Sequence, residues 1–284
     1  MTARAWLNLG LLTVLAALAA IAWLRPGQTP PQDARLLNLE ADAIDRIAIE
    51  RAGKPAVRLE KRNERWWLTS PIEIRASEAR VASLLELAIK TSHARYAAAG
   101  LELARYGLAA PPVIVKLNGE AVAFGQVNPV NQRRYVQVGD TVHLINDVLF
   151  DLETAGAAAY ASAALLPGDT NIRALRLPDI DINRTQSGTW ASSPTALSRR
   201  EIKTTLRAWR QASAIRVSAY EKRPSPDRVT VELEDGGAIV FDVIAREPAL
   251  ILARPGLRLQ YHLPTGTAES LLSPVSGPVS DPPP

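Results

Sequence analysis

The chain has 284 residues, of which 47% are hydrophobic and 22% are charged, with a formal net charge of +4 and no cysteine. This length allows one large domain or two small ones, and the apolar content is sufficient for a buried core, which excludes a wholly disordered chain. The lack of cysteine excludes disulfides, thiolate metal sites and cysteine nucleophiles.

Residues 6–24 form the strongest local signal, and they read WLNLGLLTVLAALAAIAWL without a charge. A helix of this length spans about 28 Å, close to the thickness of a hydrocarbon core. Trp6 and Trp23 lie near its ends, where indole rings favour the membrane interface. We predict a transmembrane anchor, with the chain after Arg25 outside the cytoplasm. A cleavable signal peptide is the alternative, because residues 20–22 offer a small-x-small cleavage site.

The chain between residues 36 and 272 repeats itself after a linker at 25–35. Trp67 and Pro71 recur as Trp190 and Pro194, both at an offset of 123 residues. Each pair belongs to two strand patterns joined by a polar turn, followed by Ser-Pro and then by apolar residues at helical spacing.

The patterns downstream of the Ser-Pro also correspond. The second helix is predicted to begin at a capping box of Ser198 and Glu201. Strand patterns at 113–117 and 229–233 are each followed by a Gly-containing turn and another strand. The last segment, 273–284, reads SPVSGPVSDPPP, and its proline content predicts a disordered tail.

These patterns predict an α+β fold. It consists of an N-terminal transmembrane helix followed by two tandem repeated modules, 36–162 and 163–272, each a mainly antiparallel sheet covered by an amphipathic helix. Trp67 and Trp190 are expected to be core anchors under these helices. Trp66 neighbours Trp67 on a strand, so its ring is expected to face the other way and to be exposed.

The first module also carries a family resemblance. Its landmarks, in order, are Trp67, Pro71, the segment LARYGL at 103–108, Phe124-Gly125, Asn128-Pro129 and Arg134-Tyr135-Val136. This order resembles the uncharacterised bacterial family called domain of unknown function 4340. The resemblance implies a single-anchor envelope protein, often encoded beside components of an ABC-type transport or gliding-associated system, and it carries over no catalytic residues.

The glycines among these landmarks have structural interpretations. Gly107 is expected to end a short helix in a left-handed conformation. Gly125 and Asn128-Pro129 are expected to form turns between strands.

The sequence carries no recognised catalytic or metal-binding motif. A Gly-x-Ser-x-Gly elbow, a P-loop, a His-Glu-x-x-His pair and a dinucleotide fingerprint are all missing. A three-histidine site would need His93, His143 and His262 together. His143 and His262 occupy equivalent positions of the repeat, which predicts a shared structural role. We therefore predict no enzyme activity, no cofactor and no metal.

Basic residues are numerous but dispersed. Arginine accounts for 27 of the 33, and the longest basic clusters are pairs. Nucleic-acid binding needs a basic stripe or a recognisable motif, so no nucleic-acid partner is predicted.

One polar and aromatic patch is the candidate partner or ligand surface. It gathers around a turn, and its members are Asn128, Asn131, Arg133, Arg134 and Tyr135, together with Trp66 from an earlier strand. Such a loop could bind a partner protein or hydrogen-bond a glycan.

The leading hypothesis is a non-enzymatic accessory or scaffold protein of the inner (cytoplasmic) membrane. It would span the bilayer once through residues 6–24, place its modules in the periplasm, and bind an envelope or inner-membrane protein, with an ABC-type transport assembly as a candidate. The alternative is a glycan- or peptidoglycan-binding module that uses Trp66 and Tyr135 for stacking. A hydrolase with dispersed carboxylates is the third interpretation. A groove lined by these rings would favour sugar, and a flat apolar patch would favour protein.

Overall fold

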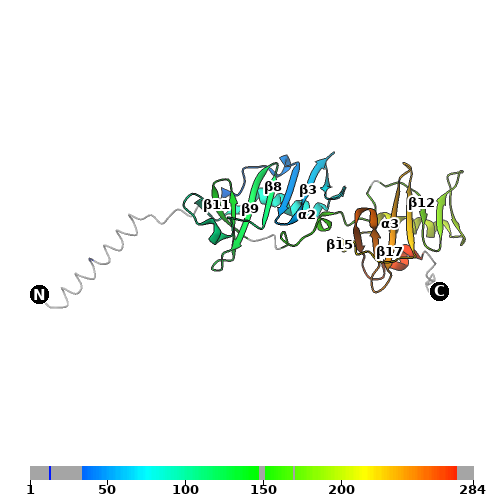
Figure 1. The fold of residues 1–284 in the computed structure, drawn as a ribbon. Coiled ribbons are helices and arrows are strands. Elements are labelled where there is room, and N and C mark those ends of the chain that lie inside the picture. The colour runs from blue at the N-terminus through cyan, green and yellow to red at the C-terminus, as the bar shows by residue number, and fades with distance from the viewer. Residues whose placement is uncertain (1–12, 14–33, 147–150, 169, 274–284) are drawn as a thin grey trace, which may run out of the picture. The chain divides into compact units, whose positions relative to one another are not determined.

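The computed structural model describes residue 13 and residues 34–146, 151–168 and 170–273. The predicted anchor at 6–24, apart from Thr13, lies outside the described residues, as do nearly all of the linker and the tail. In the described part, a nine-stranded sheet precedes an eight-stranded sheet along the chain (Figure 1).

The first sheet is mainly antiparallel, and a two-residue ribbon accompanies it. Its strands, in sheet order, are β5 (Ile74–Arg75), β4 (Arg65–Ser70), β3 (Lys54–Arg62), β2 (Arg46–Arg51), β8 (Val113–Leu117), β9 (Glu120–Val127), β10 (Arg133–Val138), β11 (Thr141–Asn146) and β7 (Ala94–Ala97). The ribbon pairs β1 (Ala34–Arg35) with β6 (Thr91–Ser92). Asn118 and Gly119 join β8 to β9 with φ of 49° and 96°, the positive values that a tight two-residue hairpin turn requires.

The second sheet is formed by residues 172–262. Its strands, in sheet order, are β14 (Trp190–Ser193), β13 (Asp181–Arg184), β12 (Ile172–Arg176), β16 (Arg228–Leu233), β17 (Ala238–Ala245), β18 (Ile251–Arg254), β19 (Leu259–His262) and β15 (Arg216–Ala219). Every adjacent pair in this row is antiparallel.

Apart from the edge strand β5 of the first sheet, the two sheets have the same strand order. Three strands joined as hairpins come first, and the row β4-β3-β2 of the first sheet corresponds to β14-β13-β12 of the second. A meander of four strands follows, β8 to β11 or β16 to β19. The strand that precedes each meander in the chain, β7 or β15, pairs with the last strand of that meander. The same connectivity therefore occurs twice in this chain.

The helices are short. The α-helices are α2 (Glu78–Leu85), α3 (Arg199–Gln211) and α4 (Thr267–Leu272), and the 3₁₀ turns are η1 (Ala41–Ala43), η2 (Glu86–Ile89), η3 (Leu103–Tyr106), η4 (Ala157–Tyr160) and η5 (Pro255–Leu257). The predicted capping box is confirmed: the Glu201 N–H donates to Ser198 Oγ at 3.3 Å, and the Ser198 N–H donates to the Glu201 carboxylate at 2.6 Å.

The predicted fold class, α+β with a transmembrane helix and two helix-covered modules, is wrong. The described chain is mainly β, because strands supply most of the core and α2 contributes only Val81 and Leu84 from its eight residues. Apolar residues at helical spacing predicted a helix in the sequence, but this spacing did not indicate how short the helix would be. Within the described residues, every helix is too short or too polar to cross a membrane. The predicted domain boundaries stay a prediction.

The aromatic core of the second sheet is built around Trp209 of α3. This side chain is fully buried, and its Nε1–H donates to the Leu271 carbonyl at 2.9 Å. Its ring lies 5.8 Å from that of Phe241 on β17, which in turn lies 6.2 Å from Tyr261 on β19. The helix and two strands of the meander are thus held by contiguous large side chains.

The burial of the repeated tryptophans differs from the expectation. Trp66 on β4 is 9% exposed and belongs to the core. Trp67 is only half-buried, and the Arg75 guanidinium lies 5.5 Å from the centre of its ring. Trp190 is half-buried as well. The assignment of Trp67 and Trp190 as core anchors, with Trp66 exposed, is therefore wrong.

A bulge in β4 is the physical reason. The pairing of β3 with β4 passes from Arg58–Ser70 to Leu59–Leu68, so Thr69 is an extra residue. One extra residue turns all the side chains beyond it to the opposite face of the sheet. The pairing of β13 with β14 has no such step, and Trp190 there lies opposite Arg184, just as Trp66 lies opposite Lys61. By strand register, Trp190 corresponds to Trp66.

Alanine substitutions of the adjacent tryptophans test this assignment. Trp66→Ala should lower the free energy of unfolding by about 3–5 kcal/mol, because it empties a core position. Trp67→Ala removes a half-buried ring and should cost about 1 kcal/mol. Denaturant titrations of the two variants would show the difference, and a larger loss for Trp67→Ala would contradict the bulged register.

Candidate functional site

The candidate surface is centred on the hairpin that joins β9 to β10. Residues 128–133 form its tip, and backbone hydrogen bonds order it. The Asn128 N–H donates to the Arg133 carbonyl at 2.7 Å, and the Gln132 N–H donates to the Asn128 carbonyl at 2.9 Å. Asn128 Oδ1 also accepts the Val130 N–H at 2.9 Å. Asn128 therefore starts the turn, as its side chain favours.

The base of the hairpin is held by the side chains that the sequence singled out. The Asn128 amide donates to Tyr135 Oη at 2.8 Å, and the rings of Tyr135 and Tyr106 lie 4.7 Å apart. The Arg134 guanidinium donates to the Gly125 carbonyl at 2.8 Å. Asn128, Arg134 and Tyr135 thus fix the shape of the hairpin.

Gly125 belongs to strand β9 and not to a turn, which corrects the expectation. The pairing of β9 with β10 has a bulge there, between Arg134 and Val136 of β10. A Cβ at Gly125 would lie 2.2 Å from the Tyr106 carbonyl oxygen, so the strand needs glycine for the close approach of η3. Gly107 ends η3 with φ of 69°, which confirms its predicted left-handed conformation.

The outermost side chain of this tip is one that the sequence analysis did not single out. Val130 is 91% exposed, with Asn131 exposed next to it and Arg133 half-buried below. Trp66 does not join this group: it is buried on β4, which β3, β2, β8 and β9 separate from β10 in the sheet order. In the sequence, the signal that could have identified Val130 was its position as a single apolar residue in a polar turn.

The two repeated histidines each lie opposite an arginine on the neighbouring strand. His143 of β11 pairs with Arg95 of β7, and His262 of β19 pairs with Arg216 of β15. We refer to the first pair as the first Arg–His block. The second Arg–His block consists of Arg216, Ser218, Gln260 and His262.

The first Arg–His block is closed by the β1–β6 ribbon. His143 is 5% exposed, and its Nδ1 lies 2.9 Å from Ser92 Oγ of β6. The Arg95 guanidinium donates to the carbonyl of Arg35 in β1 at 3.1 Å. Burial, with a contribution from the positive charge of Arg95, lowers the pKa of His143 to about 4. This histidine is therefore neutral at pH 7, in agreement with the expected structural role.

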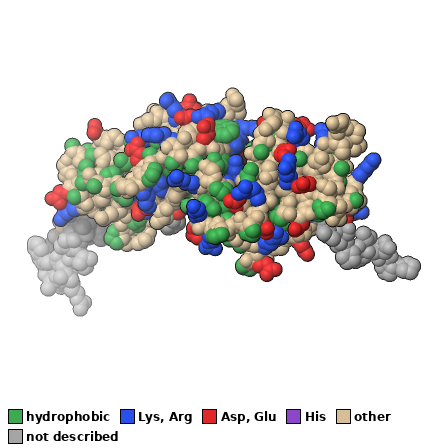
Figure 2. Space-filling model, turned by 45° about the vertical axis from the view of Figure 1, so that its right-hand side comes forward, with side chains coloured by type: hydrophobic (Ala, Val, Ile, Leu, Met, Phe, Trp, Pro, Cys, Tyr) green, Lys and Arg blue, Asp and Glu red, His purple; other side chains and the backbone are tan. Residues whose placement is uncertain are grey.

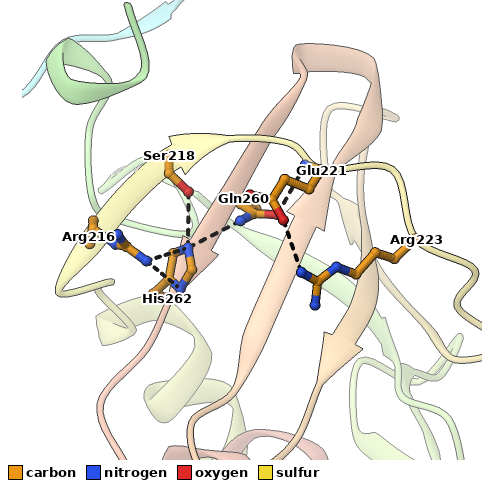
Figure 3. Close-up of polar contacts among 6 residues, drawn as sticks. All are labelled: Arg216, Ser218, Glu221, Arg223, Gln260 and His262. Atoms are coloured by element: carbon orange, nitrogen blue, oxygen red, sulfur yellow. Dashed lines mark hydrogen bonds and ion pairs between the residues drawn. The ribbon is translucent and has the colours of Figure 1, made fainter. Parts of the chain in front are cut away.

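The second Arg–His block lines a cavity of about 420 Å³. Figure 3 shows the polar contacts among its side chains. His262 Nε2 lies 3.0 Å from Ser218 Oγ, 3.3 Å from Gln260 Nε2 and 3.3 Å from the Arg216 guanidinium. Partial burial lowers the pKa of His262, the positive charge of Arg216 lowers it further, and Glu221 opposes both effects. Polar donors thus converge on an open, uncharged imidazole.

A larger cavity of about 560 Å³ lies over β12 and β13, but its charges are largely paired with one another. Arg173 and Arg176 both bind Glu232, at 3.2 and 2.6 Å. Figure 2 shows basic and acidic side chains interspersed on the face in view, as on a solvated surface. In the part of the chain that the structure describes, no three His, Asp or Glu side chains are grouped as metal ligands would be.

One comparison with known proteins gives a match. The family model described as Domain of unknown function (DUF4340) matches residues 66–222, which is more than half of the chain and includes strands of both sheets. No curated protein and no solved structure matches the chain.

Gly125→Ala should destabilise the protein because the added methyl group meets the Tyr106 backbone. We expect a loss of about 1–3 kcal/mol in the free energy of unfolding, typical of an overpacked site. Gly156→Ala is the matched control, because no atom lies within 4 Å of its new Cβ. Thermal melting of both variants checks the expectation, and equal melting temperatures would contradict the close approach.

His143 should make the protein less stable in acid. The pKa of His143 is about 4 when folded and about 6.5 when unfolded, so its contribution is intact above pH 6.5 and is lost as the pH falls toward 4. The expected loss between pH 6.5 and pH 5 is about 2 kcal/mol. His143→Gln should lose less stability than the parent over this range. Parallel stability curves for the two proteins would show that His143 titrates normally.

Proposed function

The chain belongs to the DUF4340 family, and we propose that it is a membrane-anchored, non-enzymatic accessory protein of the cell envelope that binds a protein partner through the β9–β10 hairpin. The observation that carries this proposal is the exposure of Val130, 91%, at the end of a hairpin whose shape is already fixed. Burial of this exposed apolar side chain in a pocket of another protein would be favourable.

The order of the hairpin supports binding by lowering its entropic cost. Asn128 closes the tip through backbone and side-chain hydrogen bonds, and Arg134 and Tyr135 hold its base. A loop that is already ordered loses little conformational freedom when a partner docks. Asn131 and Arg133 would supply the polar rim around the central valine.

The alternative, glycan or peptidoglycan binding, has less support. Sugar stacking needs an accessible aromatic face, but Trp66 is 9% exposed. Tyr135 packs against Tyr106, and its hydroxyl accepts the Asn128 amide. Neither ring offers the open platform that this alternative assumed.

Membrane placement rests on the charge-free segment 6–24, which, apart from Thr13, lies outside the described residues. In this proposal the segment spans the inner membrane once and the sheets lie in the periplasm. The partner is then an inner-membrane or envelope protein, and the family resemblance makes an ABC-type transport assembly the first candidate.

Site-directed crosslinking of the full-length chain in membranes tests the hairpin. A photoreactive residue at position 130 should give a discrete crosslinked product, and the same residue at position 89 should not. Ile89 is the control because it is 53% exposed but lies in η2, outside the hairpin. Val130→Asp should reduce copurification of the crosslinked partner at least tenfold, whereas Ile89→Asp should leave it unchanged.

Unchanged copurification with Val130→Asp would refute the hairpin as the docking element. Recovery of no partner, together with retention of the protein on peptidoglycan, would favour the glycan alternative.

A further inference from the structure

The second Arg–His block presents four polar side chains on one face of two strands. Arg216 lies opposite His262, and Ser218 lies opposite Gln260. Residues two apart on a strand point to the same side of the sheet, so the four form a compact square. Figure 3 shows them directed toward one another from β15 and β19.

The donors in this square outnumber the acceptor that they surround. The Ser218 hydroxyl, the Gln260 amide and the Arg216 guanidinium all lie 3.0–3.3 Å from His262 Nε2. A neutral imidazole nitrogen has one lone pair and accepts one well-directed hydrogen bond. At least two of these groups therefore have N–H or O–H bonds to offer to a ligand.

The charge of the site fits a single negative charge. Glu221 and Arg223 pair with each other at 2.9 Å at the rim of the cavity. Among the described residues, Arg216 forms no ion pair with a carboxylate. With His262 neutral, these groups sum to one positive charge. Ile244 and Ile251 line the same cavity and add an apolar wall.

The first Arg–His block shows how the protein itself fills the corresponding position. There the β1–β6 ribbon supplies a carbonyl oxygen to Arg95 and a hydroxyl to His143. In the second sheet the corresponding segments pair through the Ala164–Ser213 bridge. Among the described residues, these segments give no hydrogen bond to the side chains of Arg216 and His262, which line the cavity. In the first Arg–His block the arginine donates to a carbonyl oxygen, which indicates that an oxygen acceptor is the suitable partner for Arg216.

We propose that the second Arg–His block is a binding site for a carboxylate attached to a small apolar group. The carboxylate oxygens accept hydrogen bonds from Arg216 and from the Gln260 or Ser218 side chain, and the apolar part lies against Ile244 and Ile251. A guanidinium is well matched to a carboxylate in geometry and charge. This site is separate from the hairpin, so it stands or falls independently of the proposed function.

Occupancy of the site is linked to protonation of His262. The charged groups that face this ring are Arg216 on β15 and Glu221 and Arg223 in the segment after it, while β17 and β18 contribute only Ile244 and Ile251. A bound carboxylate adds a negative charge beside the ring and favours the imidazolium. Binding therefore raises the pKa of His262, and affinity increases as the pH falls below 7.

NMR titration of the histidine ring protons tests the proposal on the full-length chain in detergent micelles. Only three histidines are present, so His93→Gln, His143→Gln and His262→Gln assign every signal. Sodium butyrate is the probe, at constant ionic strength with chloride, and butyramide is the uncharged control. Butyrate should raise the pKa of His262 by at least 0.5, a threefold preference for the protonated form, and should leave His143 unchanged.

Two variants make the test specific. Arg216→Gln should abolish the butyrate effect. Arg207→Gln removes the same charge from an exposed position on α3 and should preserve it. Equal shifts at all three histidines, an equal effect of butyramide, or retention of the effect in Arg216→Gln would overturn the site. A larger effect of phosphate than of butyrate would overturn the carboxylate assignment.

Discussion

In both sheets, backbone hydrogen bonds between antiparallel strands determine which side chains share a face, and the candidate sites depend on that register. The pairing of β15 with β19 brings Arg216, Ser218, Gln260 and His262 together without any contribution from a helix. The pairing of β9 with β10 likewise places Arg134 near Gly125 and Tyr135 near Asn128. A shift by one residue in either pair would disperse these groups to opposite faces.

The sequence was sufficient for the features that depend on local chemistry. The capping box at Ser198 and the left-handed Gly107 are each specified by residues within one turn. The crowding of Asn128, Asn131, Arg133, Arg134 and Tyr135 around one turn was also visible, because a hairpin keeps neighbours in sequence together in space. Features of this kind can be predicted from the sequence because they do not depend on contacts between distant residues.

The features that the sequence could not supply depend on distant contacts. The bulge at Thr69 exchanged the roles of Trp66 and Trp67, and no propensity marks such an insertion. From the sequence, Gly125 was expected in a turn, but its role depends on the close approach of the Tyr106 carbonyl to a strand. The difference between His143 and His262 depends on a distant side chain, because the hydroxyl of Ser92 on β6 contacts His143 alone, and repeat positions predict the same environment for both histidines. The shortness of α2 also changed the fold class, since helical spacing indicates a face but not a length.

If residues 6–24 anchor the chain in the membrane, as proposed, the β1–β6 ribbon has a mechanical consequence. Tension entering at Ala34 is applied first to a ladder of two residue pairs and to the bond between the Arg35 carbonyl and Arg95. Such a ladder, pulled from one end, opens one pair at a time, whereas the long strands behind it resist together. Under tension the ribbon would therefore separate before the sheets do. Its separation would expose His143 and leave the Arg95 guanidinium without the Arg35 carbonyl, while the sheets stay folded.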